Sequence, residues 1–365
     1  MENKSFKQSL GLTDATMVVA GSMIGSGIFI VSADITRNVG SAGWLILLWV
    51  ITGVLTITAA LSYGELSSMY PKAGGQYVYL KEAFNPLTGF LYGWSFFAVI
   101  QTGSIAAVGV AFSKFAAYIF PSLSEKNIIA DFGFIHISAA QLTSILLIVL
   151  LTFINSRGIK NGKLIQTSFT IAKLVALFGL IIFGFILAAN KGVWNSNWST
   201  GFHLQKMDTD KFLSYSSLAA LGAVAGSMVG SLFSSDSWNN VTFIAGEIKN
   251  PQRNIGLSLF LGTVIVTIIY VATNLMYISI MPLHDIAFAE NDRVGVVASN
   301  HIFGSNGTII IALLIMVSTF GCNNGLILSG ARVYYTMAKD GLFFKSIGTL
   351  NSNGVPAKAL WIQCA

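Results

Sequence analysis

Eight mainly apolar stretches, each about 20 residues or longer, constrain the fold of this chain more than any other feature. A helix needs about 20 apolar residues to cross a hydrocarbon core of about 30 Å. The stretches occupy residues 13–35, 44–66, 87–117, 137–154, 166–189, 213–245, 256–281 and 307–337. A ninth begins at Ala359 and reaches the last residue, Ala365. The sequence therefore predicts an all-α integral membrane protein that ends early in its ninth span.

The amino-acid composition of this chain is not that of a soluble protein. Hydrophobic residues make up 54% of the chain and charged residues 10%, whereas a soluble domain has about 25% charged residues. The formal net charge of +6 fits an excess of Lys and Arg in cytoplasmic loops, so we predict no nucleic-acid partner. The four histidines show no metal-ligand spacing, and no nucleophile–base pair, P-loop or dinucleotide fingerprint is present. We therefore predict no enzyme, no metal site and no cofactor.

The distribution of basic residues predicts the orientation. Most basic residues fall in the segments that lie on the same side of the membrane as the N-terminus, among them Lys7, Lys72, Arg157 and Lys160. This distribution predicts a cytoplasmic N-terminus.

Residues 71–80 are too polar to span and too apolar for a plain loop, and we interpret them as a short interfacial or re-entrant helix. We divide the chain into a cytoplasmic segment 1–12, a first five-helix repeat 13–190, an extracellular loop 191–211 and an incomplete second repeat 212–365.

The first and sixth spans share a heptad. Residues 20–26 read Ala-Gly-Ser-Met-Ile-Gly-Ser, and residues 225–231 differ from them only by Val for Ile. The starts of the two copies are five spans apart, an odd number, so the copies have opposite orientations in the membrane, as an inverted-topology repeat requires. Chance is the alternative, because Gly, Ala and Ser are common in membrane helices.

Both heptads lie in Gly-rich polar interruptions, at residues 21–27 and 226–239. Unsatisfied backbone groups are costly in lipid, so irregular backbone survives there only where it lines a cavity or binds something. The N–H groups of an unwound helix suit a carboxylate and its carbonyls suit an ammonium group. A ligand with both groups a few ångströms apart is an α-amino acid. A plain helix-packing face is the alternative, because Gly21 and Gly25 have GxxxG spacing.

Several motifs, in order along the chain, carry a family resemblance. They are Gly-Ser-Met-Ile-Gly-Ser-Gly-Ile-Phe at 21–29, Tyr-Gly-Glu-Leu at 63–66, Phe-Ser-Ser-Asp-Ser-Trp-Asn at 233–239, Glu-Ile-Lys-Asn-Pro-Gln-Arg-Asn at 247–254 and Phe-Gly-Cys-Asn-Asn-Gly at 320–325. This pattern resembles the amino acid–polyamine–organocation (APC) superfamily of transporters, and its L-type amino acid transporter branch in particular. The resemblance implies a LeuT-like inverted repeat with discontinuous helices 1 and 6, here truncated early in helix 9.

The resemblance also implies a substrate site. Backbone N–H groups of Ser26, Gly27 and Ile28 would hold the substrate carboxylate. Carbonyls of Met23, Ile24, Phe233 and Ser234 would hold its amine, and Phe233 would act as a lid. This chain departs from the family at Ser234 and Ser235, where a small residue and an aromatic one are usual, and at Ser237 and Gly246, where Gly and Glu are usual. The serine pair makes the predicted pocket roomier and more polar.

Two charged residues are expected within the membrane. Residues 166–175 around Lys173 are similar to the fifth helix of L-type transporters, where a lysine ammonium replaces the sodium ion of related symporters and bridges helices 1 and 8. The alternative is that Lys173 extends to the cytoplasmic interface. Asp236 lies at the sixth-span break as a proton acceptor or as the N-cap of a half-helix over residues 237–247, and we favour the cap.

The resulting hypothesis is membrane transport of neutral L-amino acids by sodium-independent exchange and alternating access. A proton-coupled amino-acid or polyamine permease is the alternative, and a receptor without transport explains two broken helices poorly. Animal members of the L-type branch bind a glycoprotein through a cysteine in the loop after helix 3. The corresponding loop, residues 120–137, contains no cysteine. We therefore expect no disulfide-linked glycoprotein partner, and a multi-pass protein of the cell (inner) membrane.

Overall fold

The computed structural model describes residues 6–133, 136–209 and 211–365. Parts of three predicted segments, 1–12, 120–137 and 191–211, therefore lie outside the described residues. The α-helices are α1 (Leu12–Met23), α2 (Val31–Val39), α3 (Ala42–Met69), α4 (Gln76–Ala83), α5 (Pro86–Ser95), α6 (Gln101–Ala116), α7 (Ala139–Ser156), α8 (Ile159–Phe183), α9 (Lys191–Ser199), α10 (Ser217–Ser234), α11 (Asn240–Phe243), α12 (Pro251–Ile280), α13 (Leu283–Ala287), α14 (Val294–Phe303), α15 (Gly307–Lys339) and α16 (Ala357–Cys364).

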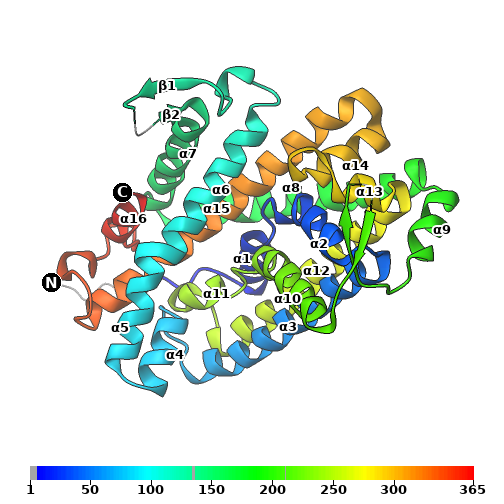
Figure 1. Ribbon diagram of the computed structural model, residues 1–365. Helices are drawn as coiled ribbons and strands as arrows, with labels where there is room; N and C mark the ends of the chain where they lie inside the picture. Colours follow the sequence, from blue (N-terminus) through cyan, green and yellow to red (C-terminus); the bar gives the residue numbers. More distant parts are fainter. Residues whose placement is uncertain (1–5, 134–135, 210) are drawn as a thin grey trace.

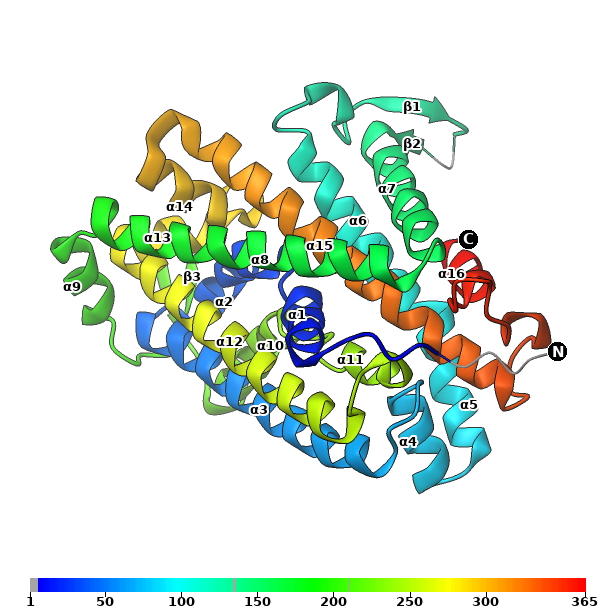
Figure 2. The ribbon, with the colours of Figure 1, turned by 180° about the vertical axis from the view of Figure 1, so that it is seen from behind.

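The helices form a bundle around α1. The long helix α15 crosses the molecule diagonally, and α3 and α12 run side by side along much of their length (Figures 1 and 2). Helix α1 packs against α8, α12 and α15, and Figure 2 shows it at the centre of the bundle. All residues of α1 from Val18 to Met23 are buried, so this short helix lies in the core and not against lipid.

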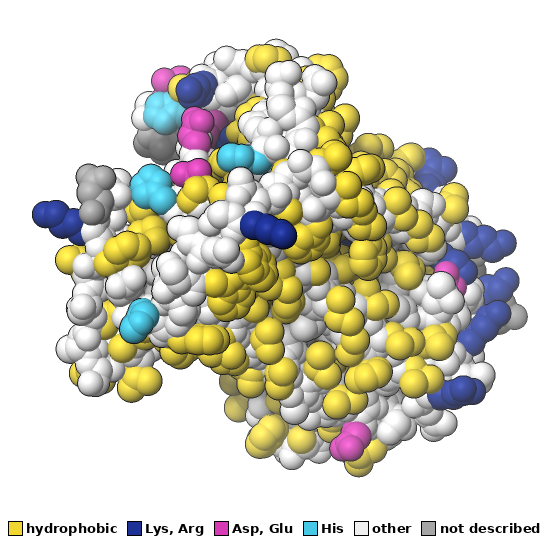
Figure 3. All heavy atoms as spheres, turned by 90° about the vertical axis from the view of Figure 1, so that its right-hand side faces the viewer, with side chains coloured by type: hydrophobic (Ala, Val, Ile, Leu, Met, Phe, Trp, Pro, Cys, Tyr) yellow, Lys and Arg dark blue, Asp and Glu magenta, His cyan; other side chains and the backbone are white. Residues whose placement is uncertain are grey.

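Seven helical segments of the described chain are long and apolar enough to cross a membrane. They are Ala42–Met69, Pro86–Ala116, Ala139–Ser156, Ile159–Ala188, Ser217–Ser234, Pro251–Ile280 and Val294–Lys339. The predicted first span, 13–35, is absent from this set because it is divided between α1 and α2, neither of which is long enough alone. Hydrophobic side chains are spread over much of the face shown in Figure 3, and Lys and Arg gather mainly towards its right-hand edge. The prediction of a helical multi-pass membrane protein is confirmed.

Two antiparallel β-hairpins interrupt the helical fold, and the sequence patterns did not predict them. Strands β1 (Ile128–Asp131) and β2 (His136–Ser138) form one hairpin, and β3 (Gln205–Asp208) and β4 (Lys211–Ser214) form the other. In the second hairpin Gln205 pairs with Ser214 and Asp208 with Lys211. The predicted loop 191–211 thus contains α9 and β3. It packs closely on Gly40, which ends α2 with a φ of 59°, a left-handed conformation that suits glycine.

The predicted short helix near residues 71–80 is present as α4. Gly74 and Gly75 precede it with φ angles of 109° and 45°, and the Gly74 N–H donates to the Phe243 carbonyl in α11 at 3.1 Å. At the end of α15, Asp340 accepts hydrogen bonds from the Tyr77 hydroxyl at 2.9 Å and Lys81 Nζ at 2.7 Å. Burial and the hydrogen bond to Asp340 raise the pKa of Tyr77, so its hydroxyl remains a donor. Helix α4 is therefore fixed to both α11 and α15.

Candidate functional site

The first predicted break lies between α1 and α2. Helix α1 ends at Met23 because Ile24 has an extended backbone with ψ 96°, and only a short 3₁₀ turn at Gly27–Phe29 separates it from α2. The Gly25, Ser26 and Gly27 N–H groups have no hydrogen-bond partner within residues 6–133, 136–209 and 211–365. These three residues are half-buried, and a backbone N–H group without a partner in the protein can donate to a ligand, so the three amides form a candidate binding element.

The second break begins where α10 ends. Helix α10 stops at Ser234, and the chain stays irregular until α11 begins at Asn240. Gly226 and Gly230 lie inside α10, so the break expected over residues 226–239 starts later than the heptad indicated and agrees with the resemblance instead. Ser237 has a φ of 69°, a left-handed conformation that favours the glycine usual in the family.

The half-helix expected over residues 237–247 is wrong. Helix α11 has four residues, its N-cap is Asn239, and a separate 3₁₀ turn follows at Ala245–Glu247. Asp236 precedes the cap by three positions, so the N-cap interpretation of Asp236 is also wrong. Its side chain instead lines the space between the two breaks.

A cavity of about 200 Å³ lies between the two breaks. Helices α1 and α10 and their breaks form one part of its wall, and α6 and α15 form the other. The lining residues are Ser22, Met23, Gly25, Ser26, Gly27, Ile30, Val31, Ser104, Val108, Phe233, Ser234, Asp236, Ser237, Cys322 and Leu326. Two interruptions more than 200 residues apart in the sequence therefore meet at one cavity with polar backbone in its wall.

Most of the residues predicted for the site come together here. Met23, Ser26, Gly27, Phe233, Ser234 and Asp236 line the cavity. Ile24 and Ile28 are fully buried and do not line it, and Ser235 faces a neighbouring cavity that also reaches Phe233 and Asp236. Phe233 is 63% exposed, so in this conformation its ring does not cover the cavity as a lid. A Cβ atom on Gly27 would collide with the Ser234 hydroxyl, which shows how closely the two breaks approach.

Lys173 is fully buried and joins α8 to α1 and α15. Its Nζ atom donates to the carbonyls of Gly21 at 2.7 Å, Ile24 at 2.8 Å and Ser318 at 3.1 Å. An ammonium group has three donors, so all three are satisfied. The alternative in which Lys173 extends to the interface is wrong, because the side chain has no exposed surface. The Ile24 carbonyl also accepts from the Ser318 hydroxyl at 3.0 Å, so both of its lone pairs are engaged.

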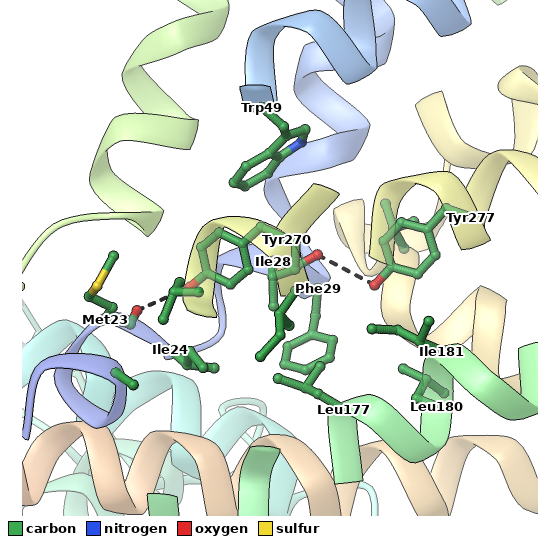
Figure 4. Packing of buried hydrophobic residues seen from close by; sticks show 14 of the residues in the cluster. Met23, Ile24, Ile28, Phe29, Trp49, Leu177, Leu180, Ile181, Tyr270 and Tyr277 are labelled. Carbon is green, nitrogen blue, oxygen red and sulfur yellow. Dashed lines mark hydrogen bonds between the residues drawn. The ribbon is translucent and has the colours of Figure 1, made fainter. Parts of the chain in front are cut away.

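Two tyrosines of α12 hold the ends of the first break (Figure 4). The Tyr270 hydroxyl lies 3.2 Å from the Met23 carbonyl and 3.0 Å from the Ser234 carbonyl. The Tyr277 hydroxyl lies 3.4 Å from the Ile28 carbonyl. Tyr270 therefore touches both broken helices, and the two carbonyls it contacts belong to the set predicted to hold a substrate amine.

The sequence patterns missed several residues of this site. Tyr270 and Ser318 carry no local motif, because single polar side chains in long apolar helices are also common packing residues. Cys322 lies in the Phe-Gly-Cys-Asn-Asn-Gly motif that was noted for the resemblance, and its Sγ lies 3.0 Å from the Ser22 carbonyl. That motif could have placed Cys322 in the site, whereas only the packing of α12 against α1, which brings the Tyr270 hydroxyl to the end of α10, shows Tyr270.

Two broken helices that share a small cavity with a few polar groups in its wall, inside a bundle of apolar spans, are typical of a membrane transporter. The sequence profile of the family described as "Amino acid permease" matches residues 10–365. The chain belongs to the amino acid permease family.

Named relatives are similar over most of the chain. The b(0,+)-type amino acid transporter 1 of Oryctolagus cuniculus is 28% identical over 357 residues, which cover 98% of this chain and 68% of the relative. The Homo sapiens protein of the same name is 27% identical over 358 residues, with 98% and 68% coverage. The large neutral amino acids transporter small subunit 2 of Mus musculus is 28% identical over 339 residues, with 92% and 59% coverage. The chain thus spans about two thirds or less of each relative.

Proposed function

We propose that this chain carries L-amino acids across a membrane by alternating access. The observation that carries the proposal is the cavity itself: it is lined by Gly25, Ser26 and Gly27, whose amides have no partner in the described chain, and by Met23 and Ser234, whose carbonyls lie 3.2 and 3.0 Å from the Tyr270 hydroxyl. Amides suit a carboxylate and carbonyls suit an ammonium group, so a zwitterionic α-amino acid matches both. The names of the relatives, all amino acid transporters, support the same substrate class.

We further propose sodium-independent exchange of neutral amino acids. The Lys173 ammonium supplies a fixed positive charge between α1, α8 and α15, and it stands where the resemblance expects a sodium ion in related symporters. The positive charge of Lys173 would repel a sodium ion at this position, so we expect no sodium to bind there. The small volume of the cavity, about 200 Å³, and its serine residues favour small or polar neutral side chains.

Uptake into proteoliposomes tests this function. We expect labelled amino acid to enter vesicles loaded with unlabelled amino acid several times faster than empty vesicles, and at the same rate when choline replaces sodium. Competition by a panel of unlabelled amino acids then gives the side-chain preference. The proposal fails if loaded and empty vesicles take up no amino acid above protein-free vesicles.

Asp236 favours a second candidate, a proton-coupled amino-acid or polyamine permease. Its carboxylate lines the cavity and forms no ion pair with any described residue. Such a group can accept a proton or attract a cationic substrate. If the chain is proton-coupled, an inward pH gradient drives uptake into empty vesicles, and Asp236→Asn abolishes that dependence. Asp208→Asn, on a hairpin away from the cavity, is the matched control. Equal pH dependence in wild type and Asp236→Asn removes Asp236 from this role.

We also propose that the N-terminus is cytoplasmic, that the chain lies in the cell (inner) membrane, and that the repeats meet at residues 191–211. The distribution of Lys and Arg supports the orientation. The name of one relative contains the words "small subunit", which points to a partner for that relative. The loop 120–137 of this chain has no cysteine, which supports a chain without a disulfide-linked glycoprotein partner. Labelling of single cysteines placed at residues 7 and 126 from each side of the membrane tests the orientation.

A further inference from the structure

A larger cavity lies away from the proposed transport site, where three separate segments meet. Its volume is about 560 Å³. Lys7 of the N-terminal segment, residues 157–161 at the turn between α7 and α8, and residues 352–354 before α16 line it. Figure 2 shows the N-terminal segment, the start of α8 and α16 at the same side of the molecule. This is the side for which the sequence predicts a cytoplasmic location.

The cavity has a marked excess of positive charge. Lys7, Arg157 and Lys160 line it, and none of them forms an ion pair with a carboxylate of the described chain. Its one acidic lining residue, Glu247, is buried and already bound by Arg332 at 2.9 Å. Three unpaired cations around a cavity attract an anion and repel the cationic end of any substrate.

Hydrogen bonds hold the walls of this cavity in place. Asn351 and Asn353 donate from their Nδ2 atoms to the Ser156 and Arg157 carbonyls, each at 2.8 Å. At Glu247, which also lines the cavity, the N–H groups of Ser9 and Leu10 donate to the Glu247 carbonyl at 2.9 and 3.0 Å. The basic side chains therefore project from a frame that exists before any ligand binds, which lowers the entropic cost of binding.

The backbone at the start of α8 adds to the same field. Gly158 is the N-cap of this 25-residue helix and provides no side-chain cap, and it lines the cavity. The first-turn amides and the positive end of the helix dipole favour an anion there. This contribution is secondary to the three cationic side chains, which come from separate segments.

We propose that this cavity binds a phosphate group, a function separate from the proposed transport. Arg157 can bind two phosphate oxygens with its planar guanidinium, and Lys7 and Lys160 act as point charges. The phosphate is the headgroup of an anionic phospholipid in the adjoining leaflet or belongs to a soluble phosphate ester. Basic pockets at the cytoplasmic ends of membrane helices commonly bind lipid headgroups. A bound phosphate would tie the N-terminal segment to the α7–α8 turn and to the loop before α16.

Direct binding measurements on the full chain test the proposal in two arms. Calorimetry in detergent measures binding of glycerol 3-phosphate and inorganic phosphate. Native mass spectrometry measures retention of phosphatidylglycerol relative to phosphatidylcholine. The test variant combines Lys7→Gln, Arg157→Gln and Lys160→Gln. The matched control combines Lys72→Gln, Lys345→Gln and Lys358→Gln, which remove the same charge from residues expected on the same side but outside the cavity. Unfolding midpoints without ligand confirm that both variants are folded.

We expect binding in at least one arm, weakened about tenfold or more in the test variant and unchanged in the control. The arm that responds identifies a soluble phosphate or a lipid headgroup. If the triple variant does not fold, Arg157→Lys replaces it, and we expect weaker binding because the planar fork is lost. No binding in either arm overturns the proposal, as does equal binding by the test and control variants. Neither result depends on transport activity.

Discussion

At the residue scale, two glycines of the first break have different structural roles. A Cβ atom on Gly27 would collide with the hydroxyl of Ser234 and would lie 2.7 Å from its Cβ. A Cβ atom on Gly25 would meet only the Cys322 sulfur, at 3.6 Å, which is an ordinary contact. Gly27 is therefore required for the two breaks to pack together, whereas Gly25 leaves space in the cavity.

This contrast predicts different outcomes for two alanine substitutions. We expect Gly27→Ala to lower the free energy of unfolding by about 1–3 kcal/mol, the usual cost of overpacking. Uptake of amino acid should fall as a consequence of this lower stability. Gly25→Ala should keep wild-type stability but weaken amino acid binding, because its methyl group enters the cavity. Thermal unfolding in detergent and ligand titration separate the two effects. Equal loss of stability in both variants would contradict this assignment.

At the element scale, α12 fixes the geometry of the broken helices. Tyr270 and Tyr277 are seven residues apart, so they lie on one face of the helix, and their hydroxyls contact the backbone on the two sides of the first break. Trp49 of α3 packs edge-on against the Tyr270 ring with centroids 5.3 Å apart (Figure 4). This packing restricts Tyr270 to the position from which it reaches both Met23 and Ser234.

Removal of the Tyr270 hydroxyl should therefore change substrate affinity more than it changes folding. We expect Tyr270→Phe to leave the fold intact and to shift the KM for amino acid severalfold, because two cavity carbonyls lose their common donor. Tyr277→Phe is the matched control: it removes a hydroxyl from the same face of α12, but its hydrogen bond is long at 3.4 Å. Uptake kinetics check the result: the KM should shift while the maximal rate stays the same. An equal shift in both variants would show that Tyr270 has no special position.

At the scale of the whole molecule, a buried ion pair closes the end expected to face the cytoplasm. The Arg332 guanidinium of α15 binds both carboxylate oxygens of Glu247, at 2.9 and 3.3 Å, and both side chains are almost fully buried. The backbone of Glu247 also binds the N-terminal segment through Ser9 and Leu10. Alternating access at this end would have to separate these parts, so the pair resists opening.

Removing one partner of this buried ion pair should lower the free energy of unfolding far more than breaking an exposed ion pair. We expect Glu247→Gln to lower the free energy of unfolding by about 3–5 kcal/mol, because it leaves the Arg332 charge buried without a partner. The control, Glu125→Gln, breaks an exposed pair with Lys114 and should cost at most about 1 kcal/mol. Unfolding measured in detergent compares them. A small effect of Glu247→Gln would mean that water reaches the pair.

Prediction from the sequence succeeded where the pattern was long or where the resemblance supplied the position. Apolar stretches of membrane-spanning length gave seven of the long helical segments, and the family motif placed the second break at the end of α10. The heptad misplaced it, because Gly226 and Gly230 also fit a continuous helix in close packing. The hairpins were missed because their strands are only three or four residues long.

The sequence alone determined that this chain is a helical membrane protein with an interruption in its first and sixth spans, since the length of an apolar stretch and the cost of glycine in a helix are local properties. Only the tertiary structure decided which backbone groups remain free at those interruptions. Lys173 and Ser318 occupy the Ile24 carbonyl, and Tyr270 joins Met23 to Ser234. Those hydrogen bonds connect residues 36 to 294 positions apart in the sequence. No local sequence pattern specifies which distant side chain donates to a given backbone carbonyl.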